Sequence, residues 1–193
     1  MRIHKRPFRF CLRTDQGLVV KVYAGFWKRA GAFALDYIII LGYLLVVVFM
    51  SLLANSLFDA NQWLFADRIR AQFVAFLIVT LPVTLYFAIS ESSARQATWG
   101  KQRLKLQVAN RDRNRISFSR SLGRTLLKFV PWELSHTLIW QIYLSPQTES
   151  VWINYGFALV YLLIGLNILS LVITKTKQTL YDLLADTYVI SSS

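Results

Sequence analysis

The sequence predicts an all-α membrane protein, a multi-pass helical bundle with a small cytoplasmic β element. Three stretches of about 20 residues are almost free of charge, and about 20 residues is the length that a helix needs to cross a bilayer. Hydrophobic residues make up 55% of the 193 residues, and the mean hydropathy is +0.41, above the usual range of soluble domains. All 22 Lys and Arg residues lie outside the apolar stretches.

The distribution of positive charge separates a membrane protein from a nucleic-acid-binding one. Eight of the Lys and Arg residues lie in 1–29, two in 51–72, ten in 91–128 and two in 174–193. A net charge of +12 would suit nucleic acid, but three long apolar runs leave little room for a soluble basic surface. Basic segments between spans are typical of the cytoplasmic side. We therefore expect contact with anionic lipid headgroups at a basic cytoplasmic face, and no nucleic-acid partner.

Cysteine and histidine usage argues against a metal, a cofactor and an enzyme. A single cysteine, Cys11, excludes an intrachain disulfide, and two His with one Cys make a structural metal site improbable. Ser135 stands beside His136, but no third partner of a hydrolase triad follows. We expect no metal site, no cofactor and no catalytic activity.

The first span carries the most informative charges. A basic N-terminal segment, 1–24, contains strand-like sequence on both sides of a turn signal at 14–17, and a span over about 27–53 follows. This span lacks a signal-peptide cleavage pattern, so we expect it to be retained. Arg29 and Asp36 are two turns apart and share one helix face, with Asp36 roughly 10 Å deeper. A carboxylate at that depth costs several kcal/mol unless a polar group meets it.

The middle of the chain alternates polar segments with a second span. The sequence predicts a polar loop over 54–70 and a span over about 71–90, in which Pro82 favours a kink. Alternating residues predict a strand over 104–108, with 116–118 as a returning strand and 188–190 as a further candidate strand of the same β element. Residues 119–128 have the pattern of a basic amphipathic helix.

The turn before the predicted strand contains Thr98, Gly100 and Lys101. The Gly-Lys pair is only superficially like a phosphate-binding loop, because that motif needs a second glycine where Arg95 stands. We predict a β-turn there.

Residues 129–145 decide the number of crossings. The stretch is short for a span and contains Glu133 and His136, whereas 151–173 is a clear span. If 129–145 crosses, the last span returns Lys175 and Lys177 to the cytoplasmic side, as the positive-inside rule favours. We predict four crossings; three crossings with an interfacial or re-entrant segment at 129–145 are the alternative.

Four motifs in this order resemble the RDD family of small membrane proteins. The first, GFWKRAGAFALD, supplies an Arg and an Asp as Arg29 and Asp36. The others are TWGKQRLKLQV from Thr98, SFSRSLGRTLLK with the family's Arg at Arg124, and QTLYDLLADTYVI with the second Asp at Asp182. Tyr181 and Asp186 depart from the pattern, where the family commonly has His and Gly.

The resemblance implies an RDD-like transmembrane domain over 25–190. It also implies membership of a family in which some proteins are linked to transport, including sodium/proton exchange, while most have no assigned activity.

Two interpretations stand for the charges near the cytoplasmic surface. Asp36 is either a proton or cation site or a carboxylate satisfied by another helix. Asp182, on a short amphipathic helix, is in position to pair with Arg29, Lys101 or Arg103, and we prefer a pair with Arg29 that fastens the tail to the first helix. For Asp186 a solvated position is preferred.

Glu133 and His136 are helix neighbours that either relay protons or lie at the membrane interface. They are three residues apart and are flanked by Trp132 and Trp140, which are typical of an interfacial aromatic belt. We prefer the interfacial interpretation, and keep both residues beside Asp36 as candidate ion or proton groups.

The leading hypothesis is therefore transport or transport support in a bacterial inner membrane, with both termini cytoplasmic and Asp36 as the intramembrane charge. The alternative is a non-catalytic scaffold or partner subunit. The two differ in whether Asp36 faces a cavity that water can reach or a sealed helix contact. Because no internal repeat is visible, transport by so small a chain would require a homo-oligomer or a membrane protein partner.

Overall fold

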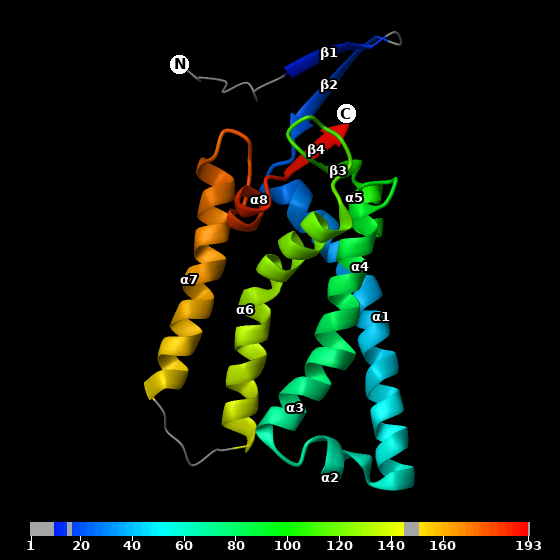
Figure 1. The fold of residues 1–193 in the computed structure, drawn as a ribbon, viewed down its shortest axis with the longest axis vertical. Coiled ribbons are helices and arrows are strands. Elements are labelled where there is room, and N and C mark those ends of the chain that lie inside the picture. The colour runs from blue at the N-terminus through cyan, green and yellow to red at the C-terminus, as the bar shows by residue number, and fades with distance from the viewer. Residues whose placement is uncertain (1–9, 15–16, 145–150, 193) are drawn as a thin grey trace.

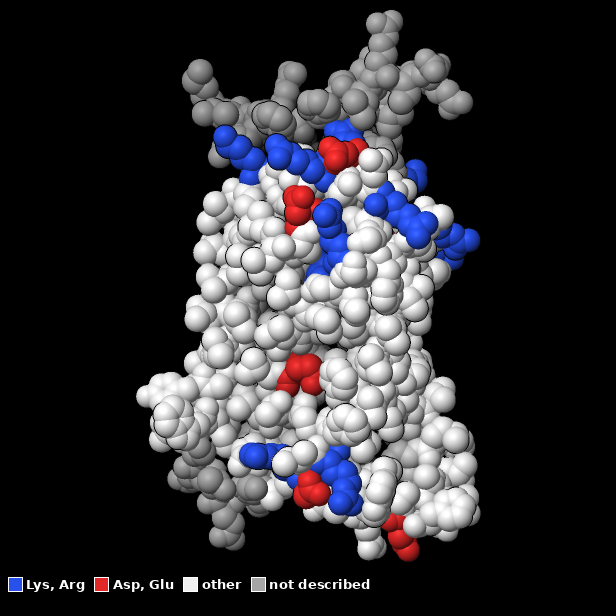
Figure 2. Space-filling model, in the orientation of Figure 1, with Lys and Arg blue, Asp and Glu red and all other residues white. Residues whose placement is uncertain are grey.

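A computed structural model describes residues 10–14, 17–144 and 151–192. Its long helices run side by side, and a small sheet lies at one end of the bundle (Figure 1). We call this end, which also carries the short helices α5 (Trp99–Arg103) and α8 (Leu180–Leu184), the basic end. Figure 2 shows Lys and Arg gathered at both ends of one face, with a mostly uncharged belt between them.

Three helices of the described chain are long and apolar enough to cross a membrane. They are α1 (Phe26–Phe58), the helix over Arg68–Ser92 and α7 (Val151–Ile173). The outward faces of α1 and α7 are exposed and apolar, as in Leu45, Phe49 and Leu162. Exposure of so large an apolar surface to water is unfavourable, whereas contact with the hydrocarbon core of a bilayer is not. These helices are therefore membrane spans. Helix α7 has the bounds of the predicted span over 151–173.

The first connection is shorter than the predicted loop over 54–70. Helix α1 continues to Phe58, a short helix α2 (Ala60–Leu64) follows, and the second span begins at Arg68 with Asp67 as its N-cap. The prediction of an extended polar loop is therefore wrong. Small polar residues such as Asn55 do not stop a helix whose other residues are strong helix formers.

The second span consists of α3 (Arg68–Ala75), a π-helix η1 (Phe76–Thr80) and α4 (Leu81–Ser92). Pro82 lies in the first turn of α4, directly after the π-helix. Proline cannot donate a backbone hydrogen bond, and a single π turn is one way for a helix to accommodate the resulting gap. The predicted irregularity at Pro82 is thus present, as a π-helix.

The segment 129–145 is part of one continuous helix, α6 (Phe118–Leu144). At about 1.5 Å per residue, its 27 residues are roughly 40 Å long, and α6 runs beside α4 and α7 along the bundle (Figure 1). The predicted helix over 119–128 is therefore present as the first part of α6, which continues to Leu144. The three cations in the first three turns of α6 explain why the segment looked like a surface helix.

The sheet joins segments that are far apart in the sequence. Its order is β1 (Phe10–Thr14), β2 (Gly17–Tyr23), β4 (Tyr188–Ser192) and β3 (Leu106–Ala109), with every pair antiparallel. The expected N-terminal strand pair is confirmed. The strand predicted over 104–108 is present but begins at Leu106 and ends at Ala109, because Leu104 and Lys105 form the turn after α5. The returning strand at 116–118 is wrong, because β3 pairs with β4 of the tail and 118 already belongs to α6.

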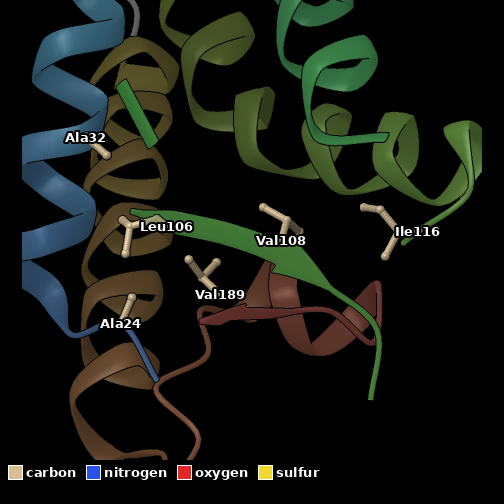
Figure 3. Close-up of a cluster of buried hydrophobic side chains, with 6 residues drawn as sticks. All are labelled: Ala24, Ala32, Leu106, Val108, Ile116 and Val189. Carbon is tan, nitrogen blue, oxygen red and sulfur yellow. The ribbon is translucent and has the colours of Figure 1, made fainter. Parts of the chain in front are cut away.

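A small apolar core lies beneath β3 and β4. Figure 3 shows Leu106 and Val108 from β3, Val189 from β4 and Ile116 from the segment before α6, together with Ala24 and Ala32. All six are almost fully buried. This core fixes the N-terminal end of α1 and the tail against the same strand, and so brings Arg29 and Asp182 close together.

Candidate functional site

Asp36 is completely buried, and three neutral donors meet its carboxylate. The Tyr86 hydroxyl donates to Oδ1 at 2.8 Å, and the backbone N–H of Gly100 donates to the same oxygen at 2.7 Å. The Thr98 hydroxyl donates to Oδ2 at 2.5 Å. The polar groups expected to meet the Asp36 carboxylate therefore come from the start of α5 and from α4.

The local sequence of α5 explains why it fits against α1. Thr98 is the N-cap of α5, so the first N–H groups of this helix lack helical partners, and that of Gly100 donates to the Asp36 carboxylate. A Cβ on Gly100 would lie 2.1 Å from the Ala32 carbonyl oxygen, so only glycine permits this approach. The predicted β-turn at Thr98, Gly100 and Lys101 is therefore wrong, because these residues form a helical turn.

Tyr86 connects α4 to the contact between Asp36 of α1 and the start of α5. Its hydroxyl donates to Asp36 and accepts from the backbone N–H of Trp99 at 3.2 Å. One tyrosine among the aromatic residues of a span carries no sequence signal of this role. Spacing from Asp36 does not reveal it either, since the two residues belong to different helices.

A second group of charges forms an alternating ion-pair network. Asp182 binds Arg29 and also Arg124, whose Nη2 lies 2.7 Å from Oδ1. Arg124 Nη1 lies 2.5 Å from Glu91 Oε2, and the other Glu91 oxygen accepts from Lys101. Because all five side chains are at most 10% exposed, each charge depends on its neighbours for compensation.

Helix α8 holds Asp182 in place. Thr179 caps α8, its hydroxyl accepts from the Asp182 N–H, and the Asp182 carboxylate accepts from the Thr179 N–H, forming a reciprocal capping box. Burial alone raises the pKa of the Asp182 carboxyl, but Arg124 and Arg29 outweigh burial and hold that pKa well below its ordinary value. Asp182 is therefore a carboxylate at neutral pH.

Arg29 closes the network at the start of α1. Besides Asp182, its guanidinium donates to the Lys177 carbonyl oxygen and, through Nε at 3.0 Å, to the Ala24 carbonyl oxygen. The contact between Arg29 and Asp182 that the sequence suggested is present, and it joins the tail to the first helix. Asp36 forms no ion pair in the part of the chain that the structure describes.

Sequence reasoning missed Glu91, the acidic centre of the network. It stands at the end of the second span beside serines, where it resembles the first residue of a polar loop. The sequence does contain a signal of its role, because Glu91 is a single carboxylate at the start of the most basic segment of the chain, 91–128. Arg103 and Asp186, in contrast, are exposed and lie outside the network; Arg103 covers the Trp99 ring at 5.1 Å.

Glu133 and His136 form a separate polar cluster deeper along α6. The Glu133 carboxylate accepts from Thr80 of η1 and from Gln72 of α3, the latter at 3.0 Å. His136 Nδ1 lies 3.7 Å from Glu133 and is buried without a hydrogen-bond partner among the described residues. This cluster is nine residues, or about 13 Å, further along α6 than Arg124, inside the bundle.

A cavity of about 470 Å³ lies between α1, α6 and α7 at the basic end. Its walls are mostly apolar, with aromatic side chains such as Phe33, Phe87 and Phe129. The charged residues around it are Arg29, Asp36, Lys101, Arg124 and Lys128. Asp36 borders this space without exposing any surface, because its oxygens point at α4 and α5.

No group of three or more His, Cys, Asp or Glu residues that could hold a metal ion occurs among the described residues. The arrangement contains ion pairs and hydrogen bonds that join four helices and the tail. These features define a class: a multi-span helical membrane protein with a buried ion-pair network at one end of the bundle.

The chain belongs to the RDD family, whose sequence profile matches residues 23–186. It is also similar to the uncharacterized protein YxaI of Bacillus subtilis (strain 168), with 27% identity over 109 residues, covering 52% of this chain and 72% of that protein. No solved structure matches the chain.

Proposed function

We propose that this RDD family protein is a non-catalytic membrane scaffold or partner subunit, in which the buried charges join the helices. The observation that carries the proposal is the environment of Asp36. Its carboxylate has no exposed surface and accepts three hydrogen bonds, all from neutral donors of α4 and the α5 segment. If Asp36 carried an ion or a proton, these three hydrogen bonds would have to break in every transport cycle.

The network around Asp182 supports the same function. A five-membered chain of alternating charges joins α1, α4, α5, α6 and α8, and the removal of one member would leave a buried charge uncompensated. Such an arrangement favours one fixed geometry at the basic end, as a surface for a partner requires.

Ion flux in proteoliposomes tests the proposal. Wild type and Asp36→Asn are reconstituted at equal folded amounts, and proton and sodium flux are followed after an imposed gradient. We expect the same flux from both proteins, with a lower melting temperature for the variant. A wild-type flux that Asp36→Asn abolishes, at unchanged melting temperature, would overturn the proposal.

A second candidate function, proton-coupled transport, is favoured by the cluster at Glu133. This carboxylate is about 25% exposed, has an ionisable neighbour in His136, and is bound by Thr80 of a π-helix, a feature frequent at functional sites. A flux lost in Glu133→Gln but kept in Asp36→Asn would establish this candidate in place of the scaffold.

The placement of the protein in the cell is part of the same proposal. We place it in a bacterial inner membrane with the basic end and both termini in the cytoplasm, because more Lys and Arg lie at the basic end than at the opposite end, which carries Arg68 and Arg70. Its basic surface would contact anionic headgroups, and its partner would be a second copy or another membrane protein.

A further inference from the structure

Among the charged residues that line the cavity, Lys128 is the one without a polar partner in the described chain. The hydrogen bonds and ion pairs of the described residues include none to its ammonium group. Its Nζ instead lies 3.5 Å from the centre of the Phe87 ring, 4.8 Å from Phe33 and 5.2 Å from Phe129. Aromatic faces compensate a desolvated cation only in part.

The local charge balance is positive. Around the cavity, Arg29, Lys101, Arg124 and Lys128 stand against Asp36, Asp182 and Glu91, which leaves one cation in excess. The three carboxylates are already bound by donors within the protein. A cation would therefore be repelled from this space, and a single anionic group would complete the balance.

The walls of the cavity define the rest of the ligand. They are mostly apolar, with Trp132 on α6 and Ile164, Ile168 and Leu171 on α7 beside the three phenylalanines. Asn167 of α7 also lines the cavity, and its amide oxygen is buried without a donor among the described residues. A suitable ligand therefore combines one negative charge, a hydroxyl group and an apolar body.

The size of the cavity fixes how much of the ligand it holds. About 470 Å³ is in the range of small-molecule sites, and the cavity is partly open, with residues of α1 and α7 in its walls. A headgroup with the first part of an acyl chain fits, while the remaining chain must extend into the bilayer. Basic pockets between membrane helices are a known setting for anionic lipids.

We propose that this cavity binds a single anionic phospholipid of the surrounding leaflet, with the phosphate on Lys128 and the acyl chain against α7. The bound lipid would be an integral part of the basic end, distinct from the general attraction of headgroups to the basic surface. It fills the space between α1 and α7 and supplies the counter-charge that the protein lacks.

Native mass spectrometry of the full chain, released from detergent, tests the proposal. The probes are phosphatidylglycerol, phosphatidylcholine, and inorganic phosphate as a competitor. We expect wild type to retain one phosphatidylglycerol at least about tenfold better than phosphatidylcholine. Lys128→Gln should lose most of this preference. Arg120→Gln, which removes the same charge from an exposed position on the same helix, should keep it.

A second variant covers the case in which Lys128→Gln does not fold. Ile168→Trp fills the apolar wall without changing charge, and it should lower retention while melting like wild type in lipid-free detergent. Equal retention of both lipids, equal loss in Lys128→Gln and Arg120→Gln, or no loss in Ile168→Trp would each overturn the site. Displacement of the lipid by millimolar phosphate would replace it with a site for a free anion.

Discussion

Asp182 shows at the scale of one residue why a pairwise description of the charges is insufficient. Its carboxylate binds Arg29 through one oxygen and Arg124 through the other. An exchange of charges between Arg29 and Asp182 would therefore restore one contact while placing an arginine against Arg124.

We expect the double variant Arg29→Asp with Asp182→Arg to show no recovery. Each single substitution leaves a buried charge without its partner and should cost about 3–5 kcal/mol of unfolding free energy. The double variant should be no more stable than Asp182→Arg, as measured by unfolding in mixed detergent micelles. Recovery of more than half of the loss would mean that Arg124 does not share Asp182.

The lowered pKa of Asp182 makes stability depend on acid in a defined direction. The folded protein holds the carboxyl ionised, whereas the unfolded chain binds a proton near the ordinary pKa of 3.8. The stabilisation is therefore complete above pH 5 and is lost as the pH falls below about 4. We expect Asp182→Asn to melt lower than wild type at pH 7, with a difference that shrinks towards pH 3. Asp186→Asn, at an exposed position of the same tail, should follow wild type at every pH.

At the scale of the elements, β4 holds the basic end together. It is the strand between β2 and β3, and Val189 belongs to the apolar core that it covers. Without it, both neighbouring strands lose their backbone partner on that side.

A chain ending after Thr187 tests this role. We expect trypsin to cut the segment around Arg111 and Arg115 faster than in the full chain, because β3 loses its pairing, while the bonds after Arg68 and Arg70 of α3 are cut at an unchanged rate. Fragments identified by mass spectrometry measure both rates. An unchanged cleavage pattern would show that β3 is held by its helical contacts alone.

The elements differ in how far the sequence could predict them. The spans follow from apolar runs, since every backbone group of a helix in lipid is satisfied within that helix. The pairing of β3 with the tail joins residues about 80 positions apart. The sequence suggested 188–190 as a further strand, but the local pattern favoured 116–118 as the direct partner of the strand over 104–108. Gly100 and Thr98 appeared as a turn, because nothing in their local sequence reveals that Asp36 faces the helix they begin.

For the candidate site, the sequence predicts that a buried charge needs a partner, but it does not predict which residue the partner is. The depth of Asp36 predicts that a polar group must meet it, but the identity of Tyr86 depends on how two helices pack. Glu91 and Lys128 gained their significance only when the fold placed them beside Arg124 and the aromatic rings of the cavity.

At the scale of the whole molecule, the prediction of four crossings requires that successive connections between the helices lie on alternate sides of the membrane. Single cysteines at Asp59, Asp112 and Trp152, in a Cys11→Ser background, report the side of each connection. All three positions are exposed in the structure. We expect a membrane-impermeant maleimide to label positions 59 and 152 from one side and position 112 from the other. Labelling of 152 from the same side as 112 would show that α6 does not cross.

The central claim is that Asp36 acts by joining α1 to α5, and a double-mutant cycle tests it most directly. Asp36→Ala removes the acceptor of three hydrogen bonds, and Gly100→Ala introduces a Cβ 2.1 Å from the Ala32 carbonyl oxygen. Each should cost about 2 kcal/mol or more. Gly123→Ala, where a Cβ meets nothing within 4 Å, is the control and should cost nothing.

The measurement is the unfolding free energy of both single variants and of the double variant. If both substitutions break the same joint, the double variant should be little less stable than the worse single one, with a coupling of about 1–3 kcal/mol. Fully additive losses would contradict the account, because Asp36 would then stabilise the protein independently of α5.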